Sequence, residues 1–219
     1  MVIALKMGFE TTFYHRIYHE NFKNMIQIKT QDFIGKGIHR ECYIHPEDRT
    51  KCIKVVFSDH DREGQREQDY YRHLEKRSIS WEMIPRFYGE VDTNLGKGVV
   101  FDLIFDHNGA PAKNLFHYLS CDELTPDIQK ALQSALPKLK NYMLEQRILT
   151  REIDPKNISC KALASGEFHL YLVDNLDNTD VIPIASYIAI LARKKVLRKW
   201  KRFENKMLKR FPHNQLFNN

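Results

Sequence analysis

Hydrophobic and polar residues alternate over the first half of the chain in short runs that predict strands. The runs "IQIKTQDFIGKG", "ECYIHP" and "KCIKVVF" fill residues 26–57 and are separated by a glycine turn and by "EDRT". Apolar runs of this length between turn residues are typical of an antiparallel meander. The runs "IPRFYGEV" and "GVVFDLIF", on either side of "DTNLGKG", predict a further hairpin.

A helical spacing appears once within this β-rich part and then dominates the second half. Segment 61–77 places Tyr70, Tyr71 and Leu74 at near-helical intervals, which predicts one inserted helix. The segment "PDIQKALQSALPKLKNYMLEQRI" is apolar on one face, and its Pro137 predicts a kink. A hairpin from "NISCKA" to "FHLYLVDN" and a helix ending near residue 210 follow. We therefore expect an α+β protein with a β-rich domain over 1–105 and a helical domain over 106–219.

Composition is that of an ordinary globular protein. The chain has 219 residues, of which 42% are hydrophobic and 28% are charged, so it can bury a sizeable core. Its four cysteines form no CxxC pair, which disfavours a zinc framework or a disulfide scaffold. The N-terminus shows no export signal, and the apolar run from Val181 to Ala192 is too short to span a bilayer. A cytoplasmic location is expected.

The positive charge belongs to the last helix. The chain carries a net charge of +6, but residues 193–210 alone hold ten Lys or Arg and one Glu, a local charge of +9. An apolar stripe runs beside this basic face through Ile188, Ala192, Val196, Trp200, Phe203, Met207 and Phe211. One interpretation is a helix packed on its own domain with a solvated basic face. The other is a peripheral contact with the anionic inner membrane; nucleic acid is disfavoured because aromatic interleaving is sparse.

Two groups of residues in the β-rich part are candidates for phosphate binding. Gly35 and Gly37 lie in a strand-turn-strand, where backbone N–H groups can approach a phosphate. Lys54 follows within "CIKVV", whose apolar residues hold its stem, and can act as a point charge for phosphate oxygens. Glu67, on the predicted helix, can pair with it. The alternative is an ordinary surface ion pair.

The stretch "ILTREIDPKNI" gathers five polar side chains in one turn between apolar flanks. Such a density of charge indicates a site rather than a simple connection. Asp174 lies at the end of the following hairpin, in "YLVDN", where it is a further candidate; the alternative is that it caps the strand end. The polar side chains of the turn are Arg151, Glu152, Asp154, Lys156 and Asn157.

Taken in order, Gly35-x-Gly37, Lys54, Glu67, "VVFDL", "TREIDPKN" and "VDN" resemble the motifs of the protein-kinase-like fold. The runs "GKGIHRECYIHPEDRTKCIKVV" and "ISWEMIPRFYGEVDTNLGKGVVFDLI" more closely resemble the YrbL family, called PhoP regulatory network proteins, of Gram-negative bacteria. The resemblance covers residues 28 to 200. It implies a two-lobed protein-kinase-like fold, with an antiparallel β N-lobe that carries one helix and a compact, truncated helical C-lobe.

The resemblance also implies that ATP and Mg²⁺ bind in the cleft between the lobes. Asn157 and Asp174 would hold the Mg²⁺ ion, and Glu152 takes the place of the catalytic aspartate. Asp154 stands where related loops often carry lysine, and it could take over as the base. With Lys54, these two carboxylates form the implied catalytic set. The implied nucleotide-binding positions are Gly35, Gly37, Arg40, Lys54, Glu67, Phe101, Asp102 and Leu103.

Departures from the kinase pattern shape the expected function. Asn175 replaces the usual Phe, and 45 residues follow Asp174, which leaves no room for a full activation segment and peptide-binding subdomain. We therefore expect a kinase-like transferase that phosphorylates a small-molecule or lipid-linked acceptor, such as a sugar or glycolipid of the bacterial envelope. The alternative is a pseudokinase that acts as a nucleotide-responsive binding or regulatory module.

Overall fold

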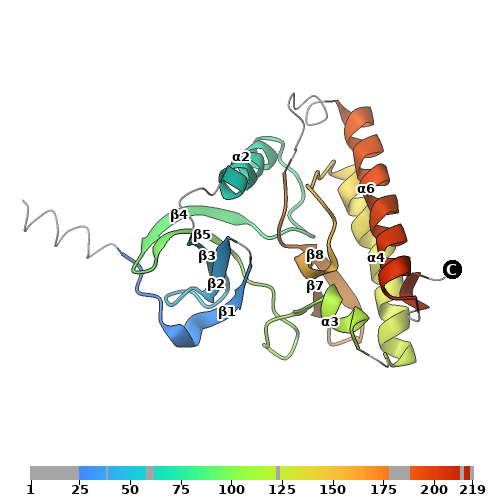
Figure 1. The fold of residues 1–219 in the computed structure, drawn as a ribbon, viewed down its shortest axis with the longest axis horizontal. Coiled ribbons are helices and arrows are strands. Elements are labelled where there is room, and N and C mark those ends of the chain that lie inside the picture. Colours follow the sequence, from blue (N-terminus) through green and yellow to red (C-terminus); the bar gives the residue numbers. More distant parts are fainter. Residues whose placement is uncertain are drawn as a thin grey trace, which may run out of the picture. The chain divides into compact units, whose positions relative to one another are not determined.

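A computed structural model describes residues 25–37, 39–57, 62–121, 124–177, 188–212 and 215–217. These residues contain four α-helices and two β-sheets, so the predicted α+β class is confirmed (Figure 1). They form two compact units. The first unit comprises Tyr88–Phe101 with the described residues before 62, and the second comprises Arg62–Phe87 with the described residues from Asp102 onward.

The first unit contains most of a five-stranded sheet, which confirms the predicted meander and hairpin. Its strands lie in the order β1-β2-β3-β5-β4, and the pairs β1-β2 and β2-β3 are antiparallel. The first strand starts later than the apolar pattern predicts. Asp32 accepts a hydrogen bond from the Lys29 backbone N–H at 3.2 Å and closes a short 3₁₀ turn there. The strands are β1 Phe33–Lys36, β2 Arg40–Ile44, β3 Lys51–Val56, β4 Phe87–Thr93 and β5 Gly96–Asp102.

The core of this unit fixes the contact between β3 and β5. Ile28, Tyr43, Ile53, Val55 and Val100 form one buried cluster. Ile53 is fully buried, and its Cγ2 lies only 2.5 Å from where a Cβ on Gly98 would be. Residue 98 must therefore be glycine for the two strands to pack at this distance.

The second unit combines the helices with a three-stranded sheet. In that sheet β6, Lys113–Asn114, pairs with β7, Ile158–Ala162, which pairs with β8, Phe168–Leu172, and both pairs are antiparallel. The hairpin predicted over 157–175 is therefore present. The helices are α2 Arg62–Lys76, α3 Leu115–Leu119, α4 Pro126–Glu145 and α6 Ala189–Arg210.

Helix α2, which the sequence places within the β-rich domain over 1–105, belongs to the second unit. The reason is a set of hydrogen bonds with the residues that follow α4. The Tyr70 hydroxyl accepts from the Leu149 backbone N–H at 2.7 Å, and the Arg77 guanidinium donates to the Gln146 carbonyl. Burial raises the pKa of Tyr70 to about 12, so its hydroxyl keeps its proton.

Helices α4 and α6 lie side by side in the second unit (Figure 1). Helix α4 runs from Pro126 to Glu145 with Pro137 inside it. The apolar stripe of α6 is buried from Ala192 to Met207, but Ile188 at its start is 47% exposed, so the stripe is shorter than predicted. The packing of α6 on its own unit is thus confirmed. Most of the apolar run Val181–Ala192 lies outside the described residues.

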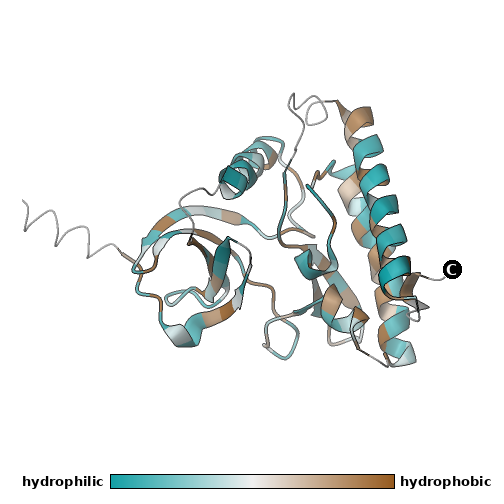
Figure 2. Ribbon diagram, viewed as in Figure 1, coloured by the Kyte–Doolittle hydropathy of each residue, from teal (hydrophilic) through white to brown (hydrophobic). Residues whose placement is uncertain are grey.

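Among the described residues, every helix is too short or too polar to cross a membrane. The most apolar part of α6 is its first turn, and Figure 2 shows mainly hydrophilic residues on the rest of that helix. Some of its charged residues contact the polar turn at residues 148–158.

Replacing Gly98 by alanine should lower the melting temperature. The added Cβ would overlap Ile53, and overpacking of this kind costs about 1–3 kcal/mol. Gly35→Ala is the matched control, because a Cβ at that position meets nothing within 4 Å. Thermal denaturation of both variants checks the prediction; equal melting temperatures would show that β3 and β5 can separate at no cost.

Candidate functional site

The polar turn between α4 and β7 is held at its start by buried contacts. Ile148 and Leu149 are fully buried or nearly so, and Thr150 is 1% exposed. The Thr150 Oγ1 lies 2.7 Å from the Asn175 carbonyl oxygen and 3.0 Å from that of Glu152. Thr150 also forms an isolated antiparallel bridge with Leu176. The turn is therefore tied to the segment that follows β8.

The register of the β7-β8 hairpin brings the two predicted metal ligands to the same end of the sheet. Ile158 pairs with Leu172, and the Val173 backbone N–H donates to the Asn157 carbonyl at 2.9 Å. Asn157 therefore lies opposite Val173, one residue before Asp174. The next residue, Asn175, has a φ of 62°, a left-handed conformation that asparagine tolerates better than a bulky side chain does. Asparagine is therefore a suitable residue at this position.

Within the turn, buried and exposed positions alternate. Ile153 and Pro155 are buried, whereas Glu152 is exposed and Asp154 is half-buried. The Asp154 carboxylate accepts a hydrogen bond from the Lys156 backbone N–H at 3.0 Å and caps a 3₁₀ turn over Pro155–Asn157. The apolar side chains thus anchor the turn and leave both carboxylates on its outer side.

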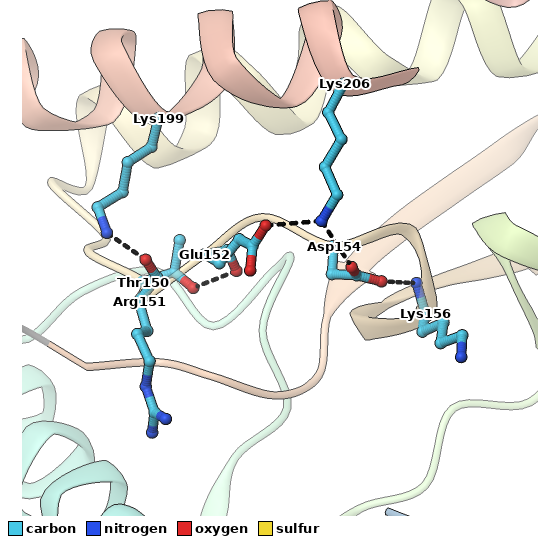
Figure 3. Close-up of polar contacts among 7 residues, drawn as sticks. All are labelled: Thr150, Arg151, Glu152, Asp154, Lys156, Lys199 and Lys206. Atoms are coloured by element: carbon cyan, nitrogen blue, oxygen red, sulfur yellow. Dashed lines mark hydrogen bonds and ion pairs between the residues drawn. The ribbon is translucent and has the colours of Figure 1, made fainter. Parts of the chain in front are cut away.

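Two lysines of α6 contact this turn, as Figure 3 shows. The Lys206 Nζ lies 2.7 Å from a Glu152 carboxylate oxygen and 3.5 Å from an Asp154 oxygen. The Lys199 Nζ donates to the Arg151 carbonyl. The hydrogen bond with Glu152 is the main reason why the pKa of Lys206 is raised. Lys206 therefore keeps its positive charge at neutral pH.

Sequence reasoning missed these two lysines as parts of the site. Their spacing carries a signal, because residues seven apart lie on the same face of a helix. The spacing alone does not reveal what that face contacts. The guanidinium of Arg151 also has a partner, because it pairs with Glu63 on α2.

The predicted phosphate-binding glycines lie at the β1-β2 turn of the first unit. The pairing of β1 with β2 is irregular between Phe33 and Gly35, and the Gly37 backbone N–H donates to the Arg40 carbonyl at 2.8 Å. The turn is thus closed by Gly37. Gly35 lies within β1 opposite Cys42, and a Cβ there would meet nothing within 4 Å.

Lys54 is held on β3 of the first unit with its ammonium over an aromatic ring. Its Nζ lies 4.7 Å from the centre of the Phe101 ring, and Phe101 is 1% exposed. This cation–π contact helps to orient the lysine. The neighbouring Asp102 exchanges hydrogen bonds with the Arg86 backbone, and Leu103, which follows β5, is half-buried.

The predicted site residues therefore form two local groups, one on the polar turn and one at the end of the hairpin. The pairing of Lys54 with Glu67 stays a prediction. Glu152 and Asp154 share Lys206, and Asn157 lies opposite Val173, the residue before Asp174. Glu67 is 2% exposed on α2 and belongs to the second unit. Lys54 belongs to the first unit, so its pairing with Glu67 remains a prediction from the sequence.

The donor set suits a Mg²⁺ ion that also binds phosphates. Within the described ranges, no cluster of three or more His, Cys, Asp or Glu side chains could enclose a metal. Mg²⁺ in nucleotide sites needs fewer protein ligands, because one or two carboxylates, waters and substrate phosphates complete its octahedron. One carboxylate from Asp174 and one amide oxygen from Asn157 fit that requirement.

The fold and the site define an α+β protein in which acidic and amide side chains lie on a capped polar turn and at the end of the neighbouring β7-β8 hairpin. Residues 26–208 match the family described as PhoP regulatory network protein YrbL. The chain is 37% identical over 182 residues to YrbL of Escherichia coli (strain K12) and to YrbL of Shigella flexneri, with 82% of this chain and 86% of each relative covered. The chain therefore belongs to the YrbL family. The wider kinase-like relationship stays a prediction.

Proposed function

We propose that this protein binds ATP with Mg²⁺ and transfers the γ-phosphoryl group to a hydroxyl of a sugar or glycolipid of the bacterial envelope. The observation that carries the proposal is the hairpin register that places Asn157 beside the residue preceding Asp174, at the end of a turn that presents Glu152 and Asp154. A carboxylate, an amide and a second outward carboxylate in this order suit phosphoryl transfer. The proposed protein-kinase-like fold rests on the same order.

The proposal assigns the phosphates of the nucleotide to groups of the first unit. In the first unit, Gly35 offers open space beside its α-carbon, and Lys54 offers an ammonium that lies over the Phe101 ring. Arg40, on β2, supplies a guanidinium where a third glycine is usual. In this proposal, Glu67 pairs with Lys54. The backbone of residues 101–103 contacts the adenine.

Transfer would proceed by one displacement at the γ-phosphorus. The acceptor oxygen forms a bond to phosphorus while the bond from phosphorus to the bridging oxygen of ADP breaks, and ADP leaves. Glu152 takes the proton of the acceptor hydroxyl; Asp154 is the other candidate base. Asn157 and Asp174 would hold the Mg²⁺ ion, which would neutralise charge on the phosphates.

A small or lipid-linked acceptor is favoured because two side chains of α6 contact the turn. In a kinase that acts on proteins, the acceptor peptide approaches the catalytic carboxylate. Here the Lys206 side chain of α6 lies against that carboxylate, and Lys199 contacts the backbone of the neighbouring Arg151 (Figure 3). The helix therefore takes up space that a peptide would need.

The same contact favours a second candidate function. The Lys206 ammonium lies 2.7 Å from the Glu152 carboxylate, the group that would orient the acceptor. In a pseudokinase, this pairing would be permanent, and the protein would act as a nucleotide-responsive binding or regulatory module. Single-turnover ATP hydrolysis separates the two functions. A transferase releases ADP when it transfers the phosphoryl group to an acceptor or to water, whereas a pseudokinase releases none.

A peripheral contact with anionic lipid is proposed for the outer side of α6. Ile190, Leu191 and Leu197 are 65%, 40% and 47% exposed, respectively. The exposed cations Arg193 and Lys194 lie between them in sequence. Apolar side chains flanked by cations suit the headgroup region of an anionic bilayer such as the inner membrane. Nucleic acid is not proposed.

Lys54→Ala and Asp174→Ala should each weaken Mg-ATP binding by roughly tenfold or more, because each removes a charged contact with the Mg-nucleotide. Isothermal titration calorimetry measures the affinity. Lys51→Ala is the matched control on β3, since Lys51 instead pairs with Asp48 at 2.9 Å. Wild-type affinity in both test variants would remove these residues from the site.

Glu152→Gln should reduce turnover roughly 10²-fold while leaving ATP affinity nearly unchanged, because it removes the proton acceptor but not a phosphate contact. Turnover is measured as ADP release with a panel of sugars and glycolipids. Asp154→Asn is the companion variant. If Asp154→Asn is inactive and Glu152→Gln is active, the base lies two residues further along the turn.

Binding to anionic vesicles should be strong at low salt and weak at physiological salt, because the Debye length falls from about 30 Å at 0.01 M to about 8 Å at 0.15 M. Vesicle co-sedimentation measures it, with neutral vesicles as the control. Replacing Arg193, Lys194, Arg198 and Lys201 by Gln should abolish binding without lowering the melting temperature, since these side chains are exposed. Equal binding by this variant would exclude the outer side of α6 as the lipid surface.

A further inference from the structure

We propose that Lys206 is a positioning residue of the transfer site, because its ammonium bridges the two candidate base carboxylates and holds Glu152 in place. The Lys206 Nζ lies 2.7 Å from Glu152 and 3.5 Å from Asp154. The inference rests on the proposed function. It adds a residue from the last helix, 52 positions beyond Asp154, to the set that the turn itself provides.

The turn needs such a cation because it carries two carboxylates close together on its outer side. Glu152 is exposed and Asp154 is half-buried, and only the buried Ile153 separates them in sequence. Like charges this close repel each other, and an approaching phosphoryl group adds further negative charge. A shared ammonium offsets both effects.

The basic side chains of the turn itself are directed elsewhere. The Arg151 guanidinium pairs with Glu63 on α2. The Lys156 Nζ lies 5.2 Å from the centre of the Phe116 ring on α3. In the part of the chain that the structure describes, Lys206 is thus the cation seen in an ion pair with these carboxylates.

Helix α6 determines where Lys206 can reach. Phe203 and Met207, on either side of it in the helix, are 2% and 0% exposed, so the backbone at residue 206 is anchored by the core. Lys199, two turns earlier, donates to the Arg151 carbonyl and fixes the same face of the helix on the turn. The Lys206 ammonium is therefore presented to Glu152 by a rigid element.

The bridge is too exposed to be needed for folding. The side chains of Lys206 and Glu152 are 42% and 58% exposed, and exposed ion pairs contribute little to stability. A residue that is dispensable for folding but placed on a candidate base is expected to affect turnover instead. This expectation separates a positioning role from a structural one.

The test uses Lys206→Met and Lys206→Arg in the full chain. Lys206→Met should lower kcat roughly tenfold or more, through misplacement of Glu152, with little change in the KM for ATP or in the melting temperature. Lys206→Arg should restore most of the loss, because it keeps a cation at this place. Lys209→Met is the matched control, since Lys209 is an exposed lysine of the same helix and should keep wild-type turnover.

A double-mutant comparison checks that Lys206 acts through Glu152. Adding Lys206→Met to Glu152→Gln should cause little further loss, because the group to be positioned is already gone. If Lys206→Met has unchanged turnover while the wild type is active, the inference is wrong. Increased turnover also overturns it, because Lys206 would then block Glu152.

A second readout does not depend on turnover. NMR titration of the Lys206 side chain should give a lower pKa in Glu152→Gln than in the wild type, because the hydrogen bond to Glu152 is the main cause of its raised pKa. An unchanged value would overturn the bridge itself. If the bridge is present but the wild type shows no turnover with any acceptor, the proposed transfer fails instead.

Discussion

The attachment of the polar turn to the segment after β8 is the constraint on which the candidate site depends. Thr150 bridges Leu176, and the Asn175 carbonyl accepts hydrogen bonds from both the Arg151 backbone N–H and the Thr150 hydroxyl. Each such hydrogen bond contributes about 1 kcal/mol to stability, but a buried donor or acceptor left without a partner costs more. Because Thr150 is buried, a turn that moved away would leave several polar groups unsatisfied. The turn and the hairpin end therefore behave as one structural element.

The charged groups built on this element follow a different rule. The contacts of Lys206 with Glu152 and Asp154 lie in partly exposed surroundings, where ion pairs add little to stability. Buried neutral groups thus hold the backbone in place, and partly exposed charges determine what the turn can do chemically. Helix α6 serves both purposes, since Phe203 and Met207 pack in the core and Lys206 reaches the carboxylates.

The spacing of apolar residues along the sequence predicted most of the helices and strands. The hairpin of β7 and β8, helix α4 and the packed helix α6 follow from apolar periodicity, and the turn at 148–158 stood out by its charge density. The membership of α2 in the second unit did not follow, because it depends on hydrogen bonds that join Tyr70 and Arg77 to residues about 70 to 80 positions further along the chain. Periodicity along one segment contains no information on such partners.

The same limit explains what the sequence missed at the site. Lys199 and Lys206 were counted only as part of a basic face, because a seven-residue spacing shows that they share a side of the helix but not what lies there. Ile188 was assigned to the apolar stripe but is 47% exposed, since the buried part of α6 begins one turn later, at Ala192. In both cases, tertiary packing decided between surfaces that the sequence pattern treats alike.

The central claim is that the chain binds ATP together with Mg²⁺. A thermal-shift titration of the wild-type protein tests it most directly, because a ligand that binds only the native state raises the melting temperature as its concentration increases. If the proposed function is correct, the melting temperature should rise with ATP concentration and rise further when Mg²⁺ is present, since Asn157 and Asp174 would then hold the ion. A melting temperature that ignores ATP at every concentration, with and without Mg²⁺, would contradict it.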